Sequence, residues 1–177
     1  MLRVLVLAIT LLVSGCTPLQ ESGTKVRHRD RQPGQIIHRG VIDVIKEERL
    51  QYIIHAGRIQ SFEKEKLTLL DSGVVVDGYN EVGQHSFVLT SDHARVEENK
   101  SIFQAEGNVI VRTDSGDVLR TERLYWDEAR HKIRSDTLVT WISEFDSLCG
   151  TEFESDENLK SMVIRQPTGQ TLRKLNP

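Results

Sequence analysis

Short segments in which apolar and polar residues alternate fill the chain from residue 36 onward. They are rich in β-branched residues and are separated by turn residues, which is typical of half-buried β-strands. Residues 41–52 fit a helical period as well as a strand period, and their polar centre could equally form a hairpin turn. The strand candidates are residues 74–76, 87–90, 103–105, 109–111, 118–121 and 137–141. The turn signals are Asp71-Ser72-Gly73, Asp77-Gly78, Asp114-Ser115-Gly116 and Thr168-Gly169.

A weak repeat organises the strand candidates into hairpins. An apolar pair two residues apart, such as Val74 and Val76, is followed by a polar turn and a return strand. The turn residues Gly83 and Gly116 of successive units are 33 positions apart. No such hairpin can bury its apolar face alone, so neighbouring hairpins must share one interior. We therefore predict an all-β fold, an antiparallel β-jelly roll or a rolled, taco-like sheet of stacked hairpins.

The N-terminal segment differs from the rest of the chain. Arg3 precedes a predominantly apolar run over residues 4–13, which is too short to span a bilayer as a mature helix but has the length of a signal-peptide core. The tetrapeptide Val13-Ser14-Gly15-Cys16 resembles a bacterial lipobox. We therefore expect residues 1–15 to be a lipoprotein signal peptide and Cys16 to be the site of lipid attachment. An ordinary secretory signal followed by a chance cysteine is the alternative.

Residues 16–34 combine two prolines and several basic side chains with little apolar periodicity, which predicts a flexible tether. Basic residues beside a lipid anchor could also contact anionic headgroups. The folded domain is then expected to comprise residues 35–177. Without the signal peptide, 22 basic side chains face 26 acidic ones, a net charge of about −4 that disfavours a nucleic-acid binder. Because Cys16 is expected to carry lipid, Cys149 should be a free thiol buried in a strand.

The residue types that carry chemistry are scattered along the chain. The six histidines show no metal-binding spacing, and no motif of a serine hydrolase, a P-loop or a dinucleotide-binding fold occurs. We therefore expect no metal, no cofactor and no catalytic residue. A C-terminal acidic cluster contains carboxylate pairs of the kind that glycosidases use, but the strand pattern spreads them over edges and turns, where solvated acids are the preferred interpretation. The cluster consists of Glu144, Asp146, Glu152, Glu154, Asp156 and Glu157.

Several phrases, in their order along the chain, resemble one known family. The phrase Ala105-Glu106-Gly107-Asn108-Val109-Ile110-Val111 is similar to the A-x-G-x-V-x-V phrase of OstA-type lipopolysaccharide transport modules. Residues 119–127, 132–136, 149–159 and 167–169 resemble the C-terminal half of LptC, the periplasmic subunit of the lipopolysaccharide export machine. The resemblance covers about residues 51–169. Many relatives keep the N-terminal segment as a transmembrane helix, whereas this chain is expected to be cleaved and lipidated.

The resemblance implies a non-enzymatic role in the periplasm of a Gram-negative bacterium. LptC proteins accept lipopolysaccharide or a related glycolipid from an inner-membrane ABC transporter and pass it along a β-jelly-roll groove to a periplasmic bridge of like modules. An apolar groove would shield acyl chains at about 25 cal/mol per Å² buried. The candidate groove residues are apolar positions of the expected interior, namely Val74, Val76, Phe87, Leu89, Phe103, Val109, Val111, Val139 and Trp141.

Two further expectations concern membranes and partners. The family favours the inner membrane, whereas Thr17 after the cysteine would direct an enteric lipoprotein to the outer membrane. The last strand-like run, residues 161–165, is expected to be a sheet edge at which Val163 and Ile164 dock the next module through main-chain hydrogen bonds. An outer-membrane adaptor lipoprotein that docks a partner without carrying lipid is the alternative function, and a glycan hydrolase is a third.

Overall fold

The computed structural model describes residues 32–157, 159 and 161–171, so the expected signal peptide, lipidation site and most of the tether lie outside the described residues. Across these described residues, eleven strands form one antiparallel sheet, with two 3₁₀ turns, η1 (Glu98–Lys100) and η2 (Glu128–Arg130), in its connections. This confirms the predicted all-β antiparallel fold. The strands are β1 (Gln35–Lys46), β2 (Arg49–Phe62), β3 (Leu67–Tyr79), β4 (His85–Ser91), β5 (His93–Glu97), β6 (Ile102–Thr113), β7 (Val118–Asp127), β8 (Lys132–Ser135), β9 (Val139–Ile142), β10 (Asp146–Asp156) and β11 (Met162–Thr171).

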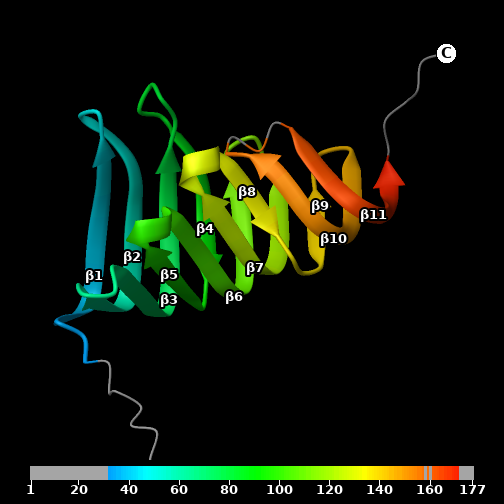
Figure 1. Cartoon of the computed structure of the whole chain (residues 1–177). Helices are drawn as coiled ribbons and strands as arrows, with labels where there is room; N and C mark the ends of the chain where they lie inside the picture. The colour runs from blue at the N-terminus through cyan, green and yellow to red at the C-terminus, as the bar shows by residue number, and fades with distance from the viewer. Residues whose placement is uncertain (1–31, 158, 160, 172–177) are drawn as a thin grey trace, which may run out of the picture. The chain divides into compact units, whose positions relative to one another are not determined.

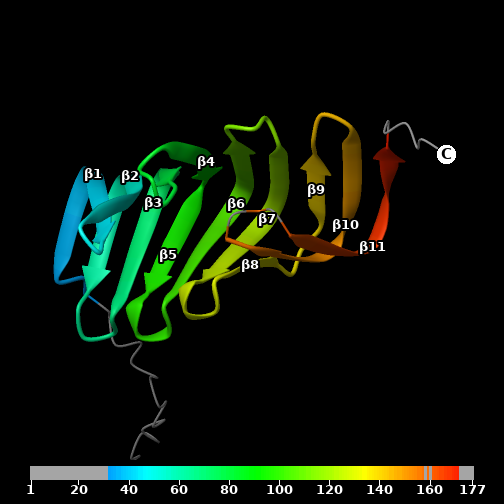
Figure 2. The same cartoon turned by 90° about the horizontal axis from the view of Figure 1, so that it is seen from above.

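The order of the strands across the sheet follows their order along the chain (Figures 1 and 2). β4 and β5 form two halves of one long rung, because both pair with β6 and both pair with β3. β8 and β9 likewise both pair with β7 and β10. Within the described residues, β1 pairs only with β2 and β11 pairs only with β10, so these two strands are the edges of the sheet. None of the helical segments in this part of the chain has the length and apolar character needed to cross a membrane.

The ambiguous residues 41–52 form the β1–β2 hairpin. Glu47 and Glu48 have φ angles of 48° and 63°, which are the left-handed conformations that a two-residue hairpin turn requires. The polar centre of the segment is therefore a turn, and the apolar residues on either side belong to strands.

Successive turns at one end of the strands are hydrogen-bonded to one another. The Glu98 N–H donates to the Lys66 carbonyl over 3.0 Å, and the Glu128 N–H donates to the Ser101 carbonyl over 3.0 Å. These bonds tie the turn between β2 and β3 to η1, and η1 to η2. The hairpin units that the sequence repeat predicts are thus stacked in register.

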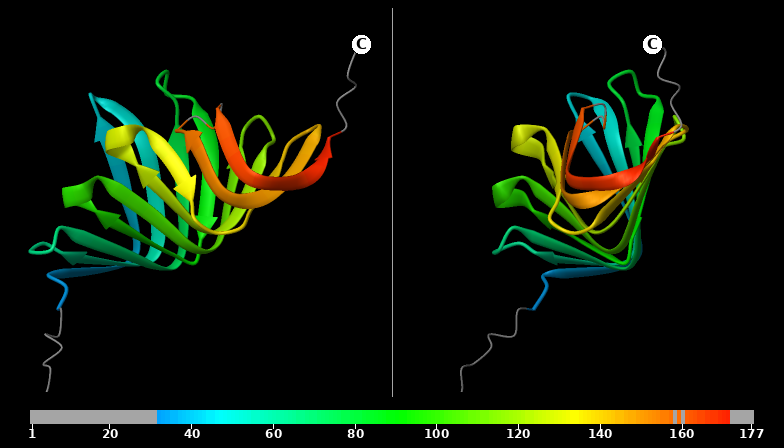
Figure 3. Two further views of the ribbon diagram at one scale, coloured as in Figure 1. Left: turned by 45° about the vertical axis from the view of Figure 1, so that its right-hand side comes forward. Right: turned by 90° about the vertical axis from the view of Figure 1, so that its right-hand side faces the viewer.

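The long strands bend near their middles, so that the sheet folds into a trough with a V-shaped section (Figure 3). The bends coincide with breaks in register, between Ala56 and Arg58 in β2 and between Glu106 and Val109 in β6. An extra residue on one strand of an antiparallel pair bends that strand and increases its local twist. The bulges therefore determine where the sheet folds.

Backbone hydrogen bonds link the bends of neighbouring strands into a line. The Gly73 N–H in β3 donates to the Asp92 carbonyl over 3.2 Å, and the Asp92 N–H donates to the Gly107 carbonyl in β6 over 2.9 Å. The Asn108 side-chain amide donates to the Asp92 carboxylate over 2.7 Å. A shared set of polar contacts thus holds the fold line where strand pairing is interrupted.

Three of the four predicted turns are wrong. Residues 114–116 lie in the β6–β7 turn, but residues 77–78 lie within β3 and residues 168–169 within β11. Ser72 and Gly73, with φ angles of 65° and 84°, form the bend of β3. At Ser72 and Gly73 the left-handed conformation serves a bulge rather than a turn, and the same residue types favour either one. The strand expected to stop at residue 165 also continues, because β11 bends near Pro167 and runs on to Thr171.

The core lies along the inside of the fold line. Its largest fully buried side chains include Leu70, Val74, Val109, Leu119, Val139 and Phe153. Cys149 lies in β10, as expected of a free thiol in a strand, but it is half-buried rather than buried. The Thr140 hydroxyl donates to its sulfur over 3.8 Å.

Candidate functional site

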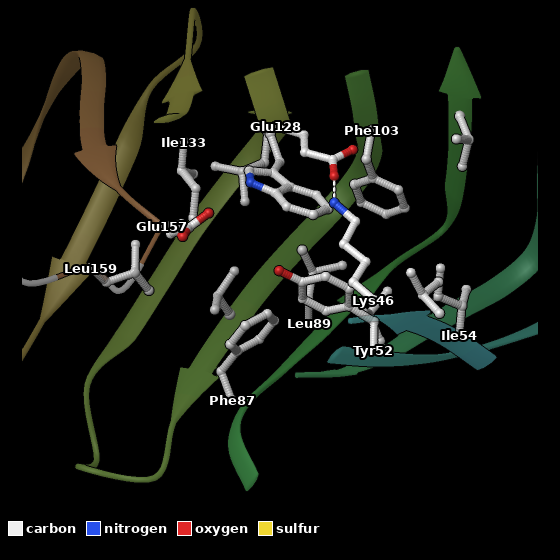
Figure 4. Close-up of a pocket in the computed structure, with 16 residues that line it drawn as sticks. Lys46, Tyr52, Ile54, Phe87, Leu89, Phe103, Glu128, Ile133, Glu157 and Leu159 are labelled. Atoms are coloured by element: carbon white, nitrogen blue, oxygen red, sulfur yellow. Dashed lines mark ion pairs between the residues drawn. The ribbon is translucent and has the colours of Figure 1, made fainter. Parts of the chain in front are cut away.

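An apolar cavity of about 170 Å³ lies inside the trough (Figure 4). Its lining comes from strands across most of the sheet and from the β10–β11 connection. The lining residues are Val44, Lys46, Tyr52, Ile54, Val76, Phe87, Leu89, Val96, Phe103, Val111, Leu124, Trp126, Glu128, Ile133, Glu157 and Leu159. Most of these side chains are aliphatic or aromatic, so the cavity is suited to an apolar guest.

The structure places the predicted groove residues in three different surroundings. Val76, Phe87, Leu89, Phe103 and Val111 all line the apolar cavity. The other four candidates lie elsewhere. Val74, Val109 and Val139 are fully buried in the core, and Trp141 lines a second pocket.

A close contact between neighbouring strands fixes the position of one cavity wall. Gly78 in β3 lies opposite Phe87 in β4, and a Cβ atom on Gly78 would collide with the Phe87 ring. The absence of a side chain at residue 78 lets the ring lie across the backbone of β3. This arrangement explains a glycine within a strand that the sequence pattern marked as a turn.

Aromatic side chains continue this wall across the trough. The Tyr52 ring lies 6.4 Å from the Phe87 ring and 4.9 Å from the Trp126 ring, the latter in an edge-to-face arrangement. These distances are typical of favourable aromatic pairs. Burial, and secondarily the negative charge of Glu157, raises the pKa of Tyr52 to about 12.

Charged side chains lie at the rim of the cavity. Lys46 at the end of β1 forms an ion pair with Glu128 in η2, as Figure 4 shows. The Lys46 ammonium also lies 6.0 Å from the centre of the Trp126 ring. Because β1 and β7 are not neighbours in the sheet, this ion pair, whose Glu128 follows β7, links parts of the rim that strand pairing does not join. Glu157 pairs with His131 over 3.2 Å.

A polar pocket adjoins the apolar cavity, and Leu159 lines both. The polar pocket has a volume of about 770 Å³ and includes His85, Asp114 and Trp141 in its lining. The His85 ring and the Asp114 carboxylate are 2.9 Å apart, and this hydrogen bond raises the pKa of His85. The pocket thus offers polar contacts beside an apolar interior.

The acidic cluster does not form one site. Glu144 and Asp146 line the polar pocket, Glu152 and Glu154 line a third pocket, and Glu157 lines the apolar cavity. Within the described residues, no group of three or more His, Cys, Asp or Glu side chains could hold a metal ion. The strands therefore separate the carboxylates that the sequence clusters.

Several cavity residues were not identified from the sequence, and Trp126 is the most informative. Val111 pairs with Leu119 in β7, but the register between β6 and β7 shifts by one residue before Ala105 pairs with Leu124. Odd-numbered positions of β7 therefore face inward before the bend and even-numbered positions after it. The apolar residues Leu124 and Trp126 lie two positions apart, and this spacing was the sequence signal that could have identified both as inward-facing.

Comparison with known proteins establishes the family. A family model described as "Lipopolysaccharide-assembly, LptC-related" matches residues 3–167. The chain belongs to the LptC family. This confirms the resemblance drawn from residues 51–169, and because the family consists of transport components, the chain is not an enzyme.

Among solved structures, this LptC-family chain is similar to LptH of Pseudomonas aeruginosa, titled the LptA-homologous periplasmic component of the conserved lipopolysaccharide transport device. The TM-score is 0.51 and the sequence identity 13%, over 71% of this chain and 95% of that chain. At this identity the likeness establishes the fold alone. No curated protein matches the chain.

Proposed function

We propose that this LptC-family protein holds lipopolysaccharide, or a related glycolipid, by its acyl chains in the periplasm. It would pass the lipid from an inner-membrane ABC transporter to a periplasmic bridge of like modules. The observation that carries this proposal is the apolar cavity inside the trough. Burying one CH₂ group contributes about 0.8 kcal/mol, so an acyl chain gains affinity with each carbon that enters. A docking-only adaptor is not favoured, since family membership points to lipopolysaccharide assembly.

The cavity volume limits how much lipid it would hold. A dry apolar cavity of about 150 Å³ binds a guest the size of benzene. The cavity of about 170 Å³ would therefore enclose part of one acyl chain and leave the sugar headgroup in water. Such a carrier performs no chemistry, and direction would come from ATP hydrolysis in the transporter.

A photo-crosslinking amino acid placed at successive β6 positions tests the proposal. At Phe103 or Val111, whose side chains line the cavity, it should capture lipopolysaccharide in cells. At Arg112, next in the strand and exposed, it should not. Equal labelling at Val111 and Arg112 would indicate surface adhesion and contradict the proposal.

We also propose that Cys16 anchors the protein to a membrane through lipid and that residues 16–34 act as the tether. The lipobox resemblance supports this anchor. Stable anchoring takes more than one acyl chain, and bacterial lipoproteins carry two or three. Intact-mass measurement of the mature protein should show an acylated Cys16, and a mature Cys16 without acyl groups would refute the anchor.

A further inference from the structure

Trp126 has a buried hydrogen-bond donor without a partner. Its Nε1 atom is shielded from solvent and makes no hydrogen bond within the part of the chain that the structure describes. A buried tryptophan N–H usually finds an acceptor, because leaving the donor unpaired away from water is unfavourable. Trp126 lines the apolar cavity, so a molecule there meets its ring, while Nε1 itself is covered and must turn toward the cavity before it can donate.

The charges around the cavity favour a neutral acceptor over an anion. Glu128 and Glu157 both line the cavity, and the ammonium of Lys46 is already paired with Glu128. A phosphate or free carboxylate in this cavity would face the Glu157 carboxylate in a poorly solvated site, and the Lys46 charge that could offset it is already compensated by Glu128. An ester or amide carbonyl, or a hydroxyl, accepts a hydrogen bond without that repulsion.

The rest of the lining indicates what carries this oxygen. Tyr52, Phe103, Leu124 and Ile133 line the same cavity as Trp126 and present apolar surface to its contents. Trp126 itself lies near the rim, because the Lys46 ammonium is 6.0 Å from its ring centre. A guest whose oxygen meets Trp126 would therefore place its hydrocarbon inward and its remaining polar part outward.

We propose that Trp126 Nε1 recognises an acyl chain by donating a hydrogen bond to a neutral oxygen at the head of that chain, either its linkage carbonyl or a hydroxyl group. This inference rests on the proposed lipid-carrying function and adds a residue that selects the ligand. Trp126 distinguishes an oxygen-bearing acyl chain from a plain hydrocarbon of the same length. It also sets how deeply the chain enters.

Two small probes of matched chain length test this proposal on the full-length protein, with methyl octanoate as the ester and octane as the hydrocarbon. The chain contains two tryptophans, so loss of one indole N–H resonance in Trp126→Phe assigns the Trp126 signal. In the wild-type spectrum, methyl octanoate should move this proton downfield, whereas octane should not. Trp126→Phe keeps an aromatic ring but removes the donor, so its affinity for methyl octanoate should fall about three- to tenfold and its affinity for octane should be unchanged.

Phe103→Leu provides the matched control, because it changes the apolar wall and keeps the Trp126 donor. It should weaken both probes to a similar extent. If both probes bind and neither the indole shift nor Trp126→Phe separates them, Trp126 does not select the oxygen, although the lipid-carrying function stands. If neither probe binds and the Phe103 crosslinker captures no lipopolysaccharide, the proposed function and this inference both fail.

Discussion

Tyr52 contributes its ring to the apolar wall of the cavity. Its hydroxyl is affected both by burial in that wall and by the charge of Glu157. Burial and the nearby Glu157 carboxylate raise the pKa of Tyr52 to about 12 in the folded protein, above its usual value of 10. Above pH 10 the folded protein therefore keeps a proton that the unfolded chain releases. Under the linkage relation, the free energy of unfolding must then fall as the pH rises.

The first prediction follows from this raised pKa. Between about pH 10 and pH 12 the wild-type protein should lose stability more steeply than Tyr52→Phe, which keeps the ring but cannot ionise. Denaturant unfolding at several alkaline pH values measures the slope. Tyr79→Phe is the comparison variant, since it removes a tyrosine hydroxyl that lies outside the cavity lining. Equal slopes for wild type and Tyr52→Phe would contradict the prediction.

At the scale of single residues, the sequence predicts which face of a strand turns inward but not whether that face meets packing or open space. Val109 and Val111 share one face of β6, yet Val109 is buried in the core and Val111 lines the cavity. The difference is their distance from the bend, which depends on how the whole sheet folds. Trp126 shows the same limit, because nothing in its local sequence distinguishes a position in the packed core from one in the cavity wall.

At the scale of elements, the bend is the feature that sequence reading misassigned. Gly107 has a φ angle of 78°, and a Cβ atom there would lie 2.6 Å from a carboxylate oxygen of Asp92. Gly116 in the β6–β7 turn has a φ angle of 96° but open space around it. Locally the two glycines look alike. Only the contact with Asp92 on the neighbouring strands shows that Gly107 belongs to a bulge, whereas Gly116 belongs to a turn.

The second prediction uses this pair of glycines. Gly107→Ala should reduce the free energy of unfolding by about 1–3 kcal/mol, because the alanine is strained and also displaces the Asp92 side chain from the fold line. Gly116→Ala carries the backbone strain alone, so its loss should be smaller. Denaturant unfolding of both variants makes the comparison. Equal losses would show that the contact with Asp92 has no role at the bend.

At the scale of the whole sheet, the strand order leaves the first and last strands as edges. β1 is twelve residues long and exposes Ile36, Val41 and Ile45, which makes it a second candidate docking edge that sequence reading missed. β11 exposes Val163, while Ile164 packs against the core. Unprotected edges invite association, so a long apolar edge is favourable only where a partner covers it. Modules joined edge to edge would extend one trough into the next.

The last prediction concerns docking at β11, where Val163 and Ile164 are the expected contacts. Successive residues of a strand direct their N–H groups to opposite sides, so proline at one of these two positions removes an N–H from the free side and at the other an N–H bonded to β10. One variant should therefore keep its fold and lose binding to a bridge module of the same fold.

The second proline variant should lose stability, because it breaks the ladder with β10. Val163→Ala is the control, since it trims an exposed side chain but keeps the N–H, so it should fold as the wild type does and keep the main-chain bonds to the partner that the proline variant loses. Binding to the bridge module and thermal unfolding are measured together for all three variants. If both proline variants fold and bind normally, docking does not use β11, and proline substitutions along β1 become the next test.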